Sequence, residues 1–138
     1  MAKLNKEAIF AAAKPKVREV EVEEWGVRLN VRAHTLRSRM ALLDADTINA
    51  DAVEEYERDQ ALPDDERTGV EKVERFDAAI INFIHSIVDD NGDQLFDLSD
   101  HDRFRDLSYA TLVSIHLAIQ QVNEVKPVSF TDLKKNSD

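Results

Sequence analysis

The stretch Lys16–Arg32, which reads KVREVEVEEWGVRLNVR, decides the class of fold. Apolar and polar residues alternate on both sides of Trp25-Gly26, and this period of two is typical of half-buried β-strands. We therefore expect a β-hairpin over about residues 17–32, with its turn at 25–26 or over 24–27. Both turns give one strand register, in which the numbers of paired residues add up to 51.

This register satisfies both faces of the hairpin at once. It joins valine to leucine or valine on one face and glutamate to arginine on the other: Val22 with Leu29, Val20 with Val31, Glu23 with Arg28, and Glu19 with Arg32. Each such cross-strand pair contributes roughly 0.2–1 kcal/mol to the stability of a hairpin.

The sequence on either side of the hairpin predicts helices. We expect helices over Asn5–Ala13, 36–60, 70–89 and 101–123, with a turn over 90–93. Three sites carry capping signals: Thr35 before the second helix, Asn49 or Asp51 at the start of its later part, and Ser99 with Asp102 before the last. His85 lies opposite the apolar stripe of the 70–89 helix, so we expect it at solvent or at a second interface.

These elements define an α+β fold that is mostly α, with an N-terminal β-hairpin followed by a bundle of about four helices. A chain of 138 residues is long enough for one hydrophobic core. We expect a single domain over residues 1–126 and a polar, flexible tail over 127–138.

Composition and charge exclude several classes of protein. The absence of cysteine excludes a disulfide scaffold, a zinc site built on thiolates and a thiol nucleophile. The net charge of -10 argues against binding to nucleic acid phosphates. The longest early apolar stretch, Ala8–Ala13, is too short to span a membrane, so we expect a cytoplasmic protein.

The charge is distributed unevenly along the chain. Residues 1–43 hold nine basic and five acidic residues, a net charge of +4, whereas residues 44–77 hold four basic and thirteen acidic, a net charge of -9. The acidic block is either a solvated surface of helices or a region that steers a partner.

The motifs of enzymes and metal sites are missing from the sequence. An EF-hand centred on Gly92 would need oxygen ligands at Ile87 and Leu98, and neither side chain has one. The four histidines share no ligand spacing, and the three glycines are too far apart to cradle a phosphate. We therefore predict no catalytic, metal-binding or cofactor-binding residues and no enzymatic activity.

The last predicted helix carries apolar residues on two opposite faces. Phe104, Leu107, Leu112, Ile115, Ile119 and Val122 form one face, and Tyr109, Val113 and Leu117 form the other. Either the helix lies in the middle of the domain, or its second face meets a partner or another copy of the chain. The candidate partner-binding residues are Tyr109, Val113 and Leu117 on this second face, together with Trp25 of the hairpin.

Four pieces of the sequence, in this order, resemble the tail assembly chaperones of long-tailed bacteriophages. They are the short N-terminal Lys-Glu-Ala helix, the hairpin of residues 20–32 that leads into Thr35-Leu36, the segment INFIHSIVDDNGDQLF that ends at Phe96, and the closing helix of residues 112–124. The resemblance covers most of residues 5–126 and rests on the order and spacing of these pieces.

The resemblance implies a non-enzymatic role. Such chaperones bind the tape-measure protein, keep it soluble, help to recruit tail-tube subunits, and are absent from the mature virion. This chain looks like the short, non-frameshifted form, and the implied location is the host cell cytoplasm. Self-association remains open, and neither nucleic acid nor a membrane is an expected partner.

Two other classes remain as alternatives. An acidic adaptor or DNA-mimic inhibitor would use the block of residues 44–77 to occupy a basic protein surface, and its binding would be strongly salt-dependent. A structural subunit of the tail would consist mostly of strands, whereas this sequence predicts mostly helix.

Overall fold

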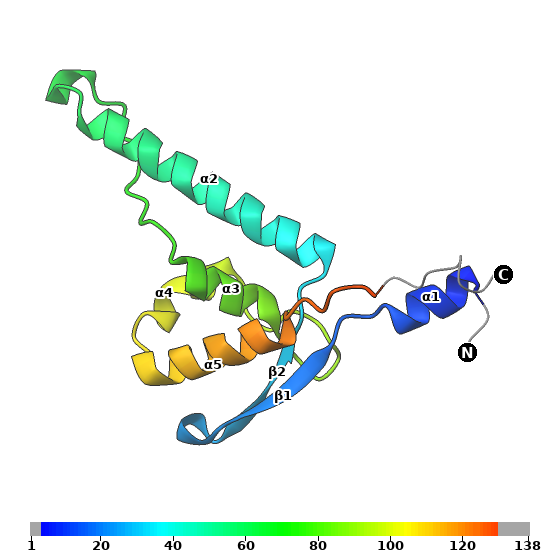
Figure 1. The fold of residues 1–138 in the computed structure, drawn as a ribbon. Coiled ribbons are helices and arrows are strands. Elements are labelled where there is room, and N and C mark those ends of the chain that lie inside the picture. The colour runs from blue at the N-terminus through cyan, green and yellow to red at the C-terminus, as the bar shows by residue number, and fades with distance from the viewer. Residues whose placement is uncertain (1–3, 130–138) are drawn as a thin grey trace.

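The computed structural model describes residues 4–129 (Figure 1). Its elements are α1 (Lys6–Ala12), β1 (Val17–Val22), η1 (Glu23–Trp25), β2 (Val27–Arg32), α2 (Leu36–Gln60), η2 (Asp64–Glu66), α3 (Ala78–Ser86), β3 (Ile87–Val88), η3 (Leu98–Asp100), α4 (His101–Phe104) and α5 (Tyr109–Val122). The predicted class is confirmed: the fold is α+β and mostly α, with an N-terminal hairpin followed by helices. The predicted tail over 127–138 falls largely outside the described residues.

The hairpin forms with its predicted faces, but its register is shifted by two residues. Val20 pairs with Leu29 and Val22 with Val27, so paired numbers add up to 49 and the predicted register of 51 is wrong. Side chains alternate with a period of two, so the shift keeps every residue on its expected face. Glu21 rather than Glu23 therefore lies opposite Arg28.

The turn explains the shift in register. The connection spans residues 23–26, so neither predicted turn, 25–26 nor 24–27, is present. Glu23–Trp25 form one 3-10 turn, and the Gly26 N–H donates a hydrogen bond of 3.1 Å to the Glu23 carbonyl. Gly26 has a φ of 64°, a conformation that glycine adopts at little cost, and it returns the chain into β2.

The predicted helix over 70–89 is only half helical. The chain stays extended until Asp77, whose carboxylate accepts hydrogen bonds from the backbone N–H groups of Ala79 and Ile80 and caps α3. At the other end the helix gives way to β3, in which Ile87 pairs with Val31 of β2. The sheet consequently has three strands in the order β1-β2-β3.

Helix α2 is continuous, and Asn49 does not cap a second helix. Thr35 is the N-cap as predicted, in a capping box with Ser38. The Asn49 side chain is buried and binds the extended segment 69–77 instead. Its amide donates to the Glu74 carbonyl at 2.9 Å and its oxygen accepts from the Phe76 N–H at 2.7 Å. These bonds keep the segment extended along α2, which projects beyond the other helices in Figure 1.

Asp59, near the far end of α2, holds the same segment. Its carboxylate accepts hydrogen bonds from the Thr68 N–H at 2.8 Å, the Thr68 hydroxyl at 3.0 Å and the Val70 N–H at 3.3 Å. The bond from the Thr68 backbone is the main reason that the pKa of Asp59 lies below its ordinary value. The ionised carboxylate of Asp59 is thus a second hydrogen-bonded link, after Asn49, between α2 and the extended segment.

We expect Asp59→Asn to weaken the hydrogen bonds that hold Thr68 and Val70 against α2. A group whose pKa is lowered by folding stabilises the folded state above its unfolded pKa, near pH 4, and loses that contribution as the pH falls through the folded value. At pH 7 the variant should therefore show severalfold faster amide exchange at Thr68 and Val70, and the difference from wild type should shrink below about pH 4. Asp64→Asn, at an exposed carboxylate paired only with Arg67 in the described residues, is the control. Equal exchange in both variants at pH 7 would contradict the role of Asp59.

The predicted helix over 101–123 is broken. Helix α4 ends at Phe104 and α5 begins at Tyr109, whereas the predicted end near Asn123 is correct. Arg105 lies in the break, where its guanidinium donates to the Arg75 carbonyl at 2.8 Å and pairs with Glu74 at 2.7 Å. The capping box before α4 is also shifted: it joins Asp97 to Asp100 instead of Ser99 to Asp102.

The core lies between the hairpin, α3 and α5. Its most buried side chains come from all three regions: Val31, Ile84, Ile87, Ile115 and Ile119. His85 is also buried, with its Nδ1 2.8 Å from the Ile81 carbonyl oxygen, so its predicted place at solvent or a second interface is wrong. Within residues 4–129, none of the helices is both long and apolar enough to cross a membrane.

Candidate partner-binding groove

The structure separates the four candidate residues into two neighbouring places. Tyr109, Val113 and Leu117 lie along the outer side of α5 with exposed fractions of 82%, 39% and 52%. Trp25 lies in the hairpin turn, where it is half-buried and packs against the core. Tyr109 and Val113 line one pocket, Trp25 lines another, and Leu117 lines neither.

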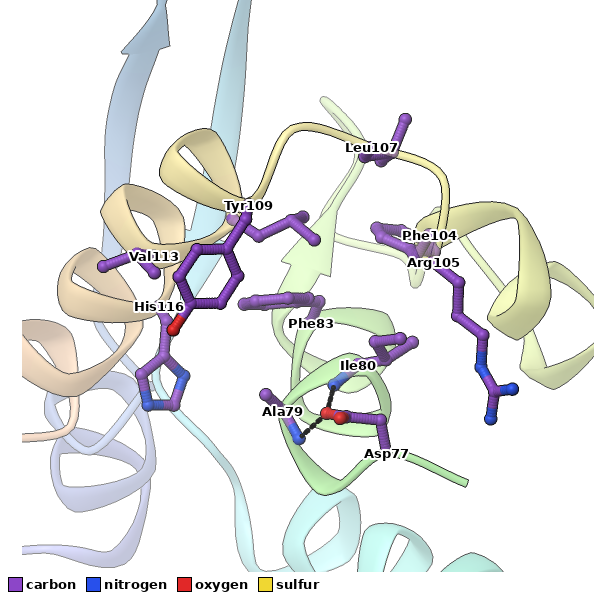
Figure 2. Close-up of a pocket in the computed structure, with 11 residues that line it drawn as sticks. Asp77, Ala79, Ile80, Phe83, Phe104, Arg105, Leu107, Tyr109, Val113 and His116 are labelled. Carbon is purple, nitrogen blue, oxygen red and sulfur yellow. Dashed lines mark hydrogen bonds between the residues drawn. The ribbon is translucent and has the colours of Figure 1, made fainter. Parts of the chain in front are cut away.

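The first pocket lies between α3, the α4–α5 connection and α5, and has a volume of about 490 Å³. Figure 2 shows Ile80 and Phe83 of α3 on one side and Tyr109, Val113 and His116 of α5 on the other. Phe104 and Leu107 close the end near the connection.

The second pocket, of about 540 Å³, is lined by Trp25, Phe96, Phe104 and Leu107, with charged residues at its rim: Asp100, Arg103 and Asp106. Phe104 and Leu107 line both pockets, so the two are neighbours separated by these side chains. We call the two together the apolar groove. Each half falls within the usual size range of ligand pockets, roughly 300–1,000 Å³.

Packed aromatic rings form the floor of the apolar groove. The Phe104 ring stacks near Phe83 with centroids 6.2 Å apart, and Phe96 meets it edge to face at 5.0 Å. His116 approaches Phe83 edge to face at 6.1 Å. Such pairs hold fixed geometries, so the floor offers a preformed apolar surface.

Several polar groups around the groove are engaged within the chain itself. Asp77 caps α3, and Arg105 pairs with Glu74. Asp97, next to Phe96, accepts hydrogen bonds from the Ser99 hydroxyl and N–H, and these bonds lower the pKa of its carboxyl. These contacts fix the walls of the groove. His116 differs, because its Nδ1 is buried and has no hydrogen-bond partner within the described residues.

Metal sites and nucleophilic serines require particular arrangements of side chains. Among the described residues there is no group of three or more His, Asp or Glu side chains placed to hold a metal ion. Among the described residues His34 has two Ser contacts: the Ser38 hydroxyl lies 3.0 Å from its Nδ1 and the Ser86 hydroxyl 3.3 Å from its Nε2. Both serines are buried, and burial lowers the pKa of His34. Ser86 is fully buried and lines none of the pockets described above, so a substrate could not reach it.

Sequence reasoning missed part of the groove. It placed Phe104 and Leu107 on the core face of one long helix, opposite Tyr109 and Val113. The break at residues 105–108 turns the two onto the same groove as α5. The Asp106 and Ser108 side chains, which favour turns and caps, were the available signal for this break.

The protein is thus a small α+β chain, mostly α, with an open groove of apolar and aromatic residues. No family model and no curated protein matches the sequence. Among solved structures, it is similar to the bacteriophage HK97 tail assembly chaperone, with 15% sequence identity and a TM-score of 0.45. The alignment covers 87% of this chain and 96% of that chain.

Proposed function

We propose that this protein is a non-enzymatic phage tail assembly chaperone that holds apolar helical stretches of the tape-measure protein in the apolar groove. The open groove is the observation that carries the proposal. Its exposed wall of Tyr109 and Val113 and its floor of Phe83 and Phe104 offer apolar contacts to a helix, a mode of recognition in which an amphipathic helix lays its apolar face into a groove.

The rest of the molecule suits a holder of apolar chains. Exposed apolar patches mark interaction sites, and they put a protein at risk of aggregation. The net charge of -10 opposes that risk by keeping copies of the complex apart. In this role the protein works in the host cell cytoplasm, helps to recruit tail-tube subunits around the tape-measure protein, and is absent from the mature virion.

The test is co-expression with a helix-rich fragment of the tape-measure protein, followed by pull-down at low and high salt. We expect the complex to survive high salt, because apolar burial dominates it. Val113→Asp should weaken binding roughly tenfold or more, since it places a charge in the buried contact. Ile48→Asp, at an exposed position on α2, makes a similar change outside the groove and should bind like wild type.

The outcomes separate the two functional classes. If the Val113→Asp variant folds and binds as tightly as wild type, the groove is not the binding site. A complex that dissociates as salt rises and is weakened by neutralising Glu54 or Glu55 would instead support an acidic adaptor acting through α2. Failure to co-purify at any salt concentration would remove the chaperone proposal.

A further inference from the structure

The outer face of α2 is largely exposed. Helix α2 turns Leu42, Ala45 and Asn49 toward the body and the extended segment. On its opposite face Leu36, Met40 and Leu43 have exposed fractions of 80%, 51% and 43%. Figure 1 shows this helix projecting past the other helices. Further along the same face Thr47 and Glu54 are exposed and Ala50 is half-buried.

The side chains on the outer face of α2 are large in the first half of the helix and smaller in its middle. At 100° per residue, one stripe contains Leu36, Met40, Leu43, Thr47, Ala50 and Glu54. The first half of this stripe carries large side chains, and the following positions carry the small Thr47 and Ala50. In a second copy of the helix running in the opposite direction, Leu43 would lie against the small Ala50 and Met40 against the stem of Glu54. Thr47 would lie near the centre, against its own counterpart.

The charges beside the stripe are divided in the same way. Arg37 and Glu55 lie on one side of it, and Arg39 and Glu57 lie on the other. Within the described residues none of the four takes part in a salt bridge. This arrangement opposes the helix dipole, which favours acidic residues at the N-terminal end and basic residues at the C-terminal end. The isolated helix therefore gains nothing from these charges, and a partner helix could use them.

We infer that α2 is a dimerisation surface, on which a second copy of this chain packs its own α2 in antiparallel orientation. In such a pair the same flanks face each other, so Arg37 meets Glu55 of the second copy and Arg39 meets its Glu57. Two-fold symmetry repeats both pairs, giving four ion pairs around a central contact. A parallel pair would instead set arginine against arginine and glutamate against glutamate.

This inference goes beyond the proposed function and stands without it. The apolar groove lies on α3 and α5, whereas the dimer uses the outer face of α2. The dimer would carry two grooves, and it would cover the exposed leucines and methionine of α2. Because the paired charges lie at the edges of the contact, the dimer should weaken as salt concentration rises.

The test is a charge exchange followed by sedimentation velocity. We expect wild type to be a dimer at micromolar to millimolar concentration and both double variants, R37E/R39E and E55R/E57R, to be monomers, because each would face like charges. An equimolar mixture of the two variants should restore a dimer. Both changes place charges as the helix dipole favours, so the loss of the dimer cannot be assigned to melting of α2.

Two controls complete the experiment. R28E/R103E alters the net charge as much as R37E/R39E, at exposed arginines outside α2, and should remain a dimer. Thr47→Cys supplies a thiol near the two-fold axis of a chain without cysteine, and mild oxidation should link two copies. A monomeric wild type, or a mixture of the double variants that stays monomeric, would overturn the inference. Double variants that each remain dimeric would also overturn it.

Discussion

Phe104→Ala should lower the free energy of unfolding by about 3–5 kcal/mol, the usual cost of removing a buried phenylalanine side chain. Phe104 is only 4% exposed, and its ring touches Phe83 on one side and Phe96 on the other. Typical domains have a total stability of roughly 5–15 kcal/mol, so the loss is a large fraction of what holds this fold. Urea unfolding followed by circular dichroism measures it.

Phe104→Leu separates the stability of the core from the shape of the groove. It keeps most of the buried volume and should cost less than about 1.5 kcal/mol. Because Phe104 lines both halves of the apolar groove, this variant should still fold but bind a helical target more weakly. A cost below about 1 kcal/mol for Phe104→Ala would contradict the central place of this ring in the core.

Local signals in the sequence were enough to predict several elements. The period of two around Trp25 predicted the hairpin and the face of each strand residue. The cap at Thr35 predicted where α2 begins, and its side chain accepts the expected backbone hydrogen bond. The short helix expected over Asn5–Ala13 is also present as α1, which Asn5 caps. Such signals lie within a few residues of the structure they determine, and this is why they could be recognised from sequence alone.

Contacts between distant segments decided the rest. Val73 and Phe76 continue the apolar stripe of α3, so the sequence favoured a helix from residue 70. Asn49, which is far away in the sequence, instead binds the backbone there and holds it extended. Tertiary contacts of this kind routinely override local helix propensity.

The groove was only partly predictable for the same reason. The helical spacing of Tyr109, Val113 and Leu117 indicated a second apolar face on the last helix, and all three side chains are exposed. Trp25 and Phe96 line one pocket, and this depends on how the hairpin packs against the segment before α4. Neither periodicity nor capping signals contain that information.

Asn49→Ala should have the second largest effect on stability, about 2–3 kcal/mol. Its side chain makes three hydrogen bonds to the extended segment: to the Glu74 carbonyl, the Phe76 N–H and the Arg75 guanidinium at 2.8 Å. Removing the amide leaves the two backbone groups without partners beside a buried position, and that costs more than the bonds themselves contribute.

In Asn49→Ala the extended segment should open more often than the rest of the fold. Asn49 and Asp59 are the side chains of α2 whose hydrogen bonds to the backbone of this segment are described above. Hydrogen–deuterium exchange should show the amides of residues 70–77 exchanging faster in Asn49→Ala, while those of α5 keep their protection. Asn49→Asp retains the oxygen that accepts from Phe76 but loses the donor to Glu74, so its effect should be intermediate. If the segment keeps its protection in the Asn49→Ala variant, these hydrogen bonds do not hold it, and the extended backbone before Asp77 must have another cause.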